Sequence, residues 1–163
     1  MKNNLFFLSV LSLLAFLACR SNPQLREELY LVLPTTTEVR YSQADLHKLD
    51  WLSGAWTGKE AGRNFRILFQ FHDDNSLEVF QFDQVKGSTM SLLSWHEGKY
   101  YFGTNRQWIV SWIGNKDVRF EPAVYGVEPM TFTRISDNQW HWVRHTAEGD
   151  EATLLERAEP MQP

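Results

Sequence analysis

Between residues 55 and 157 the chain alternates apolar and polar positions with a period of two, and turn residues interrupt the alternation at short intervals. In the segment 64–72, for example, the residues Phe65, Ile67, Phe69 and Phe71 fall on one face. Because side chains alternate between the two faces of a strand, the pattern predicts strands with one buried face. Ten segments fit this description: 55–60, 64–72, 77–85, 89–96, 99–105, 107–113, 117–121, 130–135, 139–145 and 151–157.

The connections between these segments are short and rich in Gly, Asn, Asp and Ser, which are residues that favour tight turns. Short connections place consecutive strands side by side and antiparallel, and no helical pattern lies between them. A sheet of about ten strands leaves two unpaired edges unless it closes. The sequence therefore predicts an all-β, antiparallel, up-and-down barrel, with a two-sheet sandwich as the alternative.

A different pattern precedes the first strand. Ser42 is a favourable helix cap, and Leu46 and Leu49 are spaced to share one helical face, which predicts a short helical turn. The sequence Trp-Leu-Ser-Gly-Ala-Trp at 51–56 then leads into the first strand.

The N-terminus has the pattern of an export signal. Lys2 is followed by an uncharged apolar stretch, 5–18, which is too short to span a bilayer, and then by Cys19, the one cysteine of the chain. The segment 16–19, Phe-Leu-Ala-Cys, resembles the lipobox of bacterial lipoproteins, in which the cysteine carries the lipid. We therefore expect a signal peptide at 1–18, a lipidated Cys19 with a tether at 19–41, and a barrel domain at 42–161.

The residue after the cysteine bears on the location of the protein. An Asp in that place resembles a retention signal for the inner membrane, and this chain has Arg20 there. The expected location is therefore the outer membrane of a double-membraned bacterium, with the lipid as the contact to the membrane.

Composition narrows the classes of partner. The 163 residues carry a formal net charge of −4 and no basic run, which argues against nucleic acid as a partner. Seven Trp and eleven Phe point to a strand-rich domain with an aromatic interior.

The opening motif Trp51, Leu52, Gly54 and Trp56 resembles the start of lipocalin-like (calycin) barrels. From residue 46 to about 161 the chain is similar to a bacterial lipocalin-like family of uncharacterised function. It departs from that family's late Phe-Glu-Asn-Pro element, since 120–122 reads Phe-Glu-Pro, and from its early Glu-x-Trp element, which is Phe-Gln-Phe at 69–71. Nitrobindins, which bind haem, share the opening motif, but their haem-binding histidine is not identified among the five histidines here.

The resemblance implies that Trp56 closes one end of the barrel beneath a stacked basic side chain. Arg157 in the last strand is the candidate for that side chain, with Arg134 and Arg144 as rivals. Gly54 is expected to let the chain bend sharply into the first strand.

No catalytic, metal-binding or cofactor motif stands out. His141 and His145 share a strand face, but at four residues apart they lie about 13 Å from each other, which is too far to hold one metal ion. The chain contains no Gly-x-Ser-x-Gly, phosphate-binding glycine loop or His-Glu-x-x-His motif. We therefore predict no catalytic residues, no metal and no cofactor.

Tryptophans recur on one face of two segments, 107–113 and 139–145. These faces are expected to point inward, because four exposed tryptophans would form an unusually large apolar patch. They either fill the core or line a ligand cavity together with arginines that could meet an anionic head group. The predicted lining residues are Phe69, Trp108, Trp112, Arg134, Trp140, Trp142 and Arg144.

The leading hypothesis is a lipoprotein whose barrel binds a small hydrophobic or amphipathic ligand without catalysis. A filled barrel that docks another envelope protein, or an enzyme acting on a hydrophobic substrate, are the alternatives. An open interior favours the first of these and a solidly packed interior the second.

Overall fold

The structure of the chain is a computed structural model, and it describes residues 39–159 except 74, 84 and 86. The predicted signal peptide, Cys19 and the tether up to residue 38 lie outside the described residues, as do positions 160 and 161 of the predicted barrel domain. Within the described part, no helix has the length and hydropathy needed to cross a membrane.

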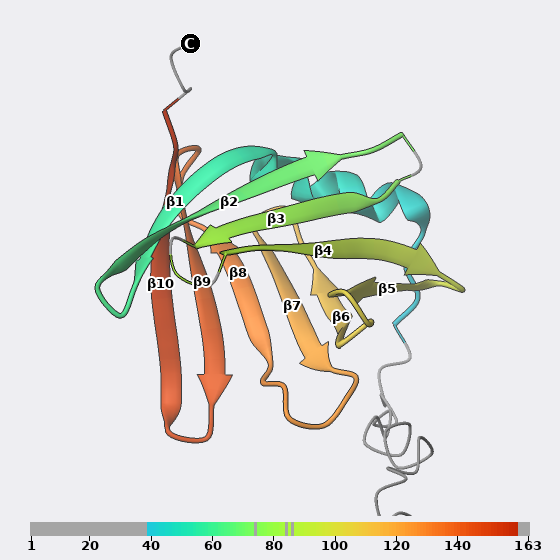
Figure 1. The fold of residues 1–163 in the computed structure, drawn as a ribbon. Coiled ribbons are helices and arrows are strands. Elements are labelled where there is room, and N and C mark those ends of the chain that lie inside the picture. Colours follow the sequence, from blue (N-terminus) through green and yellow to red (C-terminus); the bar gives the residue numbers. More distant parts are fainter. Residues whose placement is uncertain (1–38, 74, 84, 86, 160–163) are drawn as a thin grey trace, which may run out of the picture. The chain divides into compact units, whose positions relative to one another are not determined.

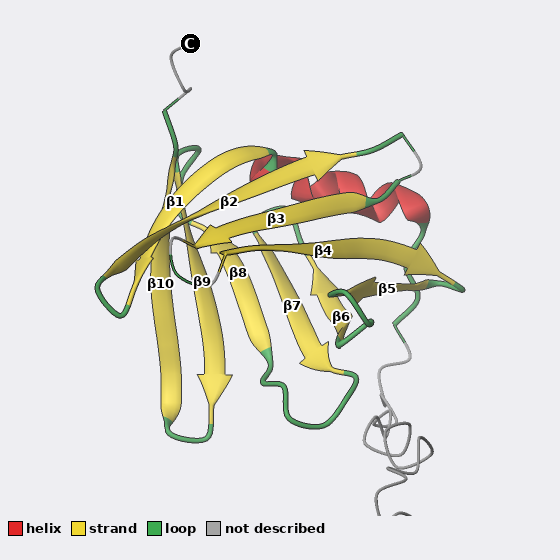
Figure 2. Ribbon diagram, viewed as in Figure 1, coloured by secondary structure: helices red, strands yellow, loops and turns green. Residues whose placement is uncertain are grey.

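The described chain forms one helix and ten antiparallel strands that close into a barrel (Figure 1; Figure 2). Each strand pairs with its neighbours in sequence, and β1 pairs with β10, so the predicted all-β, up-and-down barrel is confirmed and the sandwich is wrong. Every strand overlaps one of the ten predicted segments. The elements are η1 (Gln43–Leu52), β1 (Gly54–Glu60), β2 (Arg63–Phe71), β3 (Leu77–Asp83), β4 (Gly87–His96), β5 (Lys99–Phe102), β6 (Trp108–Ile113), β7 (Asp117–Pro122), β8 (Met130–Arg134), β9 (Gln139–Thr146) and β10 (Gly149–Arg157).

The helix η1 is a ten-residue 3₁₀ helix, longer than the single turn predicted. A 3₁₀ helix has three residues per turn, so side chains three apart lie on the same face. Leu46, Leu49 and Leu52 have this spacing, and each is at most 1% exposed within the barrel core. At the start of the helix, the carboxylate of Asp45 accepts hydrogen bonds from the backbone N–H and the hydroxyl of Ser42. The three-residue spacing of the leucines therefore explains why the helix is of the 3₁₀ type and why one face of it packs into the barrel core.

The helix occupies the end of the barrel where β1 begins, which we call the closed end. We call the opposite end, where β1 ends and β10 begins, the mouth. Exposure of the inward-facing side chains rises from the closed end to the mouth along β4 and β10, whereas Met130 at the mouth end of β8 is buried. Along β10, Leu155 is buried, Thr153 is half-buried and Glu151 is exposed, and β4 repeats the trend from Leu93, which is buried, to Thr89, which is exposed. The closed half is thus packed, and the mouth is exposed to solvent at β4 and β10.

Tyr100 fastens η1 to the barrel wall. Its ring is fully buried, and its hydroxyl lies 2.7 Å from the carbonyl oxygen of Gln43 and 3.1 Å from that of Ser42, to which it donates a shared hydrogen bond. Burial raises the pKa of Tyr100 to about 12. The neutral phenol is therefore favoured in the folded state.

Replacement of Tyr100 by Phe is expected to lower the free energy of unfolding by about 1 to 2 kcal/mol, because buried carbonyls lose their donor. The raised pKa adds a pH dependence: stability is intact below the ordinary value of 10.0 and falls as pH rises towards about 12. Tyr100→Phe should weaken this alkaline loss, and Tyr41, whose pKa burial also raises, should retain part of it. Urea unfolding between pH 8 and pH 11.5 measures both effects.

The matched control is Tyr125→Phe, since Tyr125 is 65% exposed and the change should leave stability within about 0.5 kcal/mol. A Tyr100→Phe protein with wild-type stability and a wild-type alkaline profile would show that the hydroxyl does not fasten the helix.

Candidate functional site

The closed end is built around Trp56, which is 1% exposed. Its indole N–H donates to the carbonyl oxygen of Leu52 at 2.7 Å, and the guanidinium carbon of Arg157 lies 4.2 Å from its ring centroid. Arg157 also donates to the carbonyl oxygens of Ser53 and Asp137. This is the arrangement that the lipocalin resemblance implies, with Arg157 rather than its two rivals in the stacked position.

Gly54 lies in the bend before this stack. Its φ of 101° is unfavourable for any residue with a side chain, and a Cβ atom there would lie 3.2 Å from the guanidinium of Arg157. Trp51 lies close by, with its ring 6.3 Å from that of Trp140 in an edge-on contact. The four predicted barrel-closing residues, Trp51, Gly54, Trp56 and Arg157, are therefore together at the closed end.

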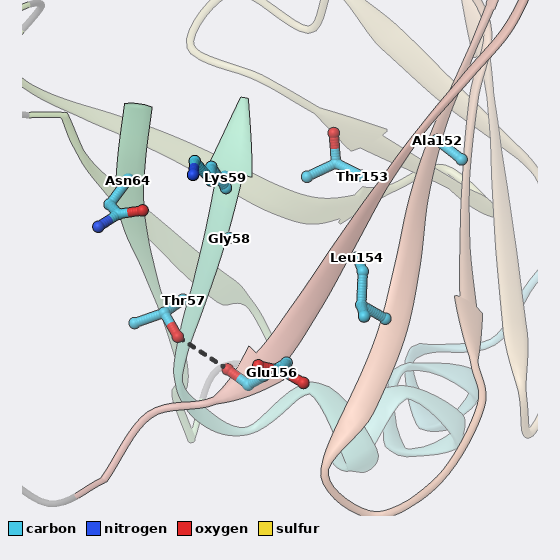
Figure 3. A pocket seen from close by; sticks show the side chains of 8 residues that line it. All are labelled: Thr57, Gly58, Lys59, Asn64, Ala152, Thr153, Leu154 and Glu156. Carbon is cyan, nitrogen blue, oxygen red and sulfur yellow. Dashed lines mark hydrogen bonds between the residues drawn. The ribbon is translucent and has the colours of Figure 1, made fainter. Parts of the chain in front are cut away.

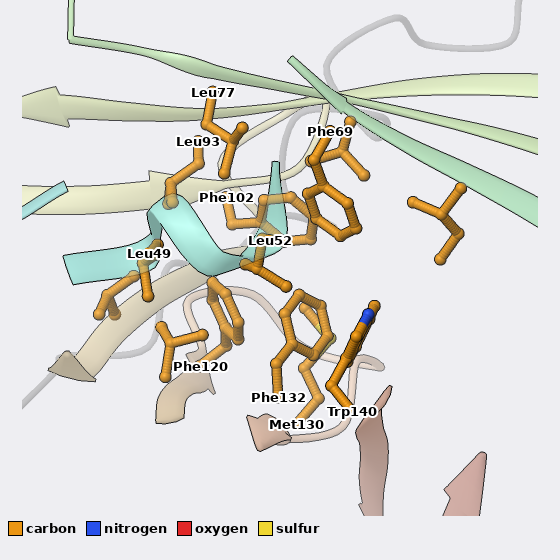
Figure 4. Close-up of a cluster of buried hydrophobic side chains, with 14 of the residues drawn as sticks. Leu49, Leu52, Phe69, Leu77, Leu93, Phe102, Phe120, Met130, Phe132 and Trp140 are labelled. Atoms are coloured by element: carbon orange, nitrogen blue, oxygen red, sulfur yellow. The ribbon is translucent and has the colours of Figure 1, made fainter. Parts of the chain in front are cut away.

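Two of the predicted lining residues lie in the packed half of the interior (Figure 4). Phe69 and Trp140 are buried, their rings are 5.8 Å apart, and both contact the ring of Phe132. Aromatic contacts at these distances are typical of a filled core. Phe69 and Trp140 form the floor beneath the mouth.

Trp142 and Trp108 lie nearer the mouth and are only half-buried. Trp142 packs edge-on against Phe65, 6.3 Å between centroids, and Trp108 packs against Phe102 at 5.8 Å. The indole N–H of Trp108 donates to the carbonyl oxygen of Glu128. These two tryptophans lie between the mouth and the aromatic floor.

Four buried polar groups have no hydrogen-bond partner among the described residues: the indole N–H groups of Trp51, Trp140 and Trp142 and the hydroxyl of Tyr41. Of these four residues, Trp142 lies nearest the mouth. A buried donor without an acceptor costs about 1 to 3 kcal/mol. An oxygen atom on a bound molecule is one means of satisfying such a group.

The prediction that Trp112 lines the interior is wrong. Trp112 is 55% exposed, and its indole N–H donates to the Asp117 carboxylate on the outer surface. The register of β6 against β7 shifts between Val110 and Trp112, which marks a β-bulge. An extra residue reverses the inside–outside alternation, so Trp112 points away from the interior that Val110 faces.

The two predicted lining arginines already have carboxylate partners. Arg144 on β9 reaches Glu60 on β1 at 2.8 Å and Glu151 on β10 at 2.7 Å, close to the mouth. Arg134, at the end of β8 that meets the closed end, pairs with Asp137. Arg134 is thus remote from the mouth, and neither arginine needs an anionic ligand to balance its charge.

The wall of the barrel has an incomplete seam between β1 and β10. These strands pair at only three positions, from Trp56–Arg157 to Gly58–Leu155, and then diverge towards the mouth. A groove of about 530 Å³ occupies the divergence (Figure 3). It is lined by Thr57, Gly58, Lys59, Asn64, Ala152, Thr153, Leu154 and Glu156.

Sequence reasoning missed Glu60, Glu151 and the residues at the seam. The alternation predicts part of this arrangement. Glu60 lies on the same strand face as Trp56, and Glu151 on the same face as Leu155, so both carboxylates are expected to face inward. The divergence of β1 from β10 had no signal, since it depends on how the ends of the sheet meet.

One hydrogen-bonded chain has the connectivity of a hydrolase triad. Thr131 Oγ1 lies 2.8 Å from His145 Nε2, and His145 Nδ1 lies 2.9 Å from Asp150 Oδ1. The alternation that turns Arg144 inward places these side chains on the outer face of β8–β10, and none of them lines the seam groove. We interpret the hydrogen bonds between Thr131, His145 and Asp150 as a network that links three strands on the outer surface. In the described part of the chain, no three potential metal ligands gather at one point.

The closed antiparallel barrel and its Trp–Arg closing pair are consistent with a lipocalin-like fold. Comparisons of the chain with protein-family models, curated proteins and solved structures find no match.

Proposed function

We propose that this protein is an envelope lipoprotein whose barrel binds a small hydrophobic or amphipathic molecule without converting it. The observation that carries the proposal is the unpartnered indole N–H of Trp142, a half-buried side chain near the mouth that packs against the aromatic interior. Small-molecule sites are typically apolar cavities with a few polar groups of this kind.

The charges at the mouth refine the class of ligand. Arg144 contacts two carboxylates, so its charge is already balanced, and an added anionic head group would have to displace one of them. An uncharged head group with an acceptor oxygen, such as an ester or an amide, meets the free N–H donor of Trp142 without that displacement. We therefore favour a neutral amphipathic ligand over a fatty acid anion.

The lipid part of the proposal rests on the N-terminal sequence. In it, the signal peptide at 1–18 is removed, Cys19 carries the lipid, and the barrel is held at the outer membrane of a double-membraned bacterium. A barrel held there meets amphipathic molecules at the membrane surface.

The test uses N-phenyl-1-naphthylamine, an uncharged fluorescent probe, with the Cys19→Ser chain. We expect saturable quenching of tryptophan emission, and displacement of the probe by a long-chain methyl ester at a lower concentration than by the corresponding acid. Trp142→Phe, which removes one free N–H, should weaken the ester by about three- to tenfold, the effect of a single neutral hydrogen bond.

Trp112→Phe is the matched control, because it makes the same change on the outer surface and should leave ester competition unchanged. Absence of saturable quenching would overturn the binding proposal. Equal effects of the two substitutions would remove Trp142 from the site.

A filled barrel that docks another envelope protein is the second candidate, favoured by an apolar outer surface on β3 and β4. Phe82, Met90 and Leu92 are 46%, 51% and 37% exposed there, and Phe80 pairs with Met90 across the two strands. Exposed apolar groups clustered in this way mark interaction surfaces. If no probe enters the barrel, this surface becomes the better account of function.

A further inference from the structure

The strand β10 has a free edge along its first six residues. On one side it pairs with β9 from Gly149 to Glu156, but on the other side it pairs with β1 only at Leu155, Glu156 and Arg157. Residues 149–154 therefore present backbone N–H and C=O groups that no strand of the described chain accepts. Such an edge is a template for an additional strand, and no proline interrupts it.

The seam groove runs beside this edge, and two of its lining residues, Gly58 and Thr153, face inward. The ring of Phe65 covers Gly58, since a Cβ atom there would lie 2.6 Å from that ring, and Thr153 is half-buried. The neighbours of these two residues in the sheet are Phe65, opposite Gly58, and Trp142, opposite Thr153, and their rings are in contact. An inward-pointing apolar side chain on an added strand would meet these two rings.

The charges beside the groove favour a basic side chain on the added strand, two residues from the apolar one. Glu151, two residues before Thr153, points to the same side of β10, and it shares the guanidinium of Arg144 with Glu60. One guanidinium thus faces two carboxylates in this cluster. A lysine or arginine on the added strand would balance the second carboxylate.

We propose that residues 149–154 of β10 bind an extended peptide segment of a partner protein by strand addition. The segment runs antiparallel to β10, which is the more stable pairing, and carries an apolar side chain beside Thr153 and a basic side chain beside Glu151 two residues later. This site shares the ring of Trp142 with the interior ligand site, but its backbone edge does not depend on a bound ligand, so neither proposal depends on the other.

The experiment titrates ¹⁵N-labelled Cys19→Ser chain with the peptide acetyl-Thr-Val-Thr-Lys-Thr-amide. We expect saturable shifts of the amide resonances of residues 149–154, slower hydrogen exchange at the same amides, and a dissociation constant on the order of 0.1 mM. A peptide with methylated backbone nitrogens should lose binding. Peptides with Glu in place of Lys, or with Val and Lys exchanged, should bind about tenfold more weakly.

Three results would overturn the proposal: no saturable shift up to about 5 mM peptide, a concentration far above the expected dissociation constant; equal binding of the methylated peptide; or a peptide-independent protection of residues 149–154 that rises with protein concentration. The last result would assign the edge to a second copy of this chain.

Discussion

Replacement of Trp56 by Ala is expected to lower the free energy of unfolding by about 3 to 5 kcal/mol, the range for large aromatic truncations in packed cores. The side chain is 1% exposed, and its ring lies edge-on to Trp140 at 6.1 Å. Its removal leaves a cavity at the closed end and takes away the ring over which Arg157 is stacked. Urea unfolding followed by circular dichroism measures the change.

Trp112→Ala provides the matched control, because it truncates the same side chain where it is 55% exposed. The loss there should remain under about 1 kcal/mol, since the substitution creates no cavity. If the two variants lose similar stability, or if Trp56→Ala costs under about 1 kcal/mol, Trp56 does not close the barrel as described.

The sequence was sufficient to predict the barrel because each level of local information agreed. Alternation placed the ten strands, turn residues placed their ends, and the opening motif placed Trp56 and Gly54 at the closed end. Short connections then left few topologies open, since consecutive strands pair with each other. The helix type was also implicit, because Leu52 continues the three-residue spacing of Leu46 and Leu49.

Trp112 could not be placed because a bulge changes parity from within a strand. Alternation treats positions 108–113 as one uninterrupted face, and a single unpaired residue between Val110 and Trp112 is enough to reverse the second half. The only local sign is that apolar residues occur at 109, 110 and 113, which strict alternation does not allow. Such a sign is compatible with several registers.

The mouth was predicted less well because its chemistry is non-local. Arg144 was expected to be able to meet an anionic head group, but its carboxylate partners come from two other strands, one of them 84 residues away in sequence. Pairings of this kind depend on how far β1 and β10 diverge before the barrel opens. The presence of charge at the mouth was therefore predictable, and its neutralisation was not.

The proposed lipid anchor at Cys19 is the feature whose loss has the largest expected effect on location. Replacement of Cys19 by Ser should move nearly all of the protein out of the membrane fraction or leave it unprocessed, because this is the one cysteine available for the lipid. A single acyl chain binds membranes only marginally, whereas several chains on one cysteine hold a protein durably. Fractionation of cells, with mass spectrometry of the N-terminal peptide, measures both location and lipid.

A second variant separates lipidation from any general effect of losing a thiol. In the Cys19→Ser chain, Ser21→Cys restores a cysteine two residues beyond the expected cleavage position, where the lipobox pattern no longer precedes it. We expect this double variant to remain outside the membrane fraction. A Cys19→Ser protein that is processed and fractionates as the wild type does would show that the lipoprotein proposal is wrong. Attachment of the protein to the membrane would then depend on a contact other than a lipid on Cys19.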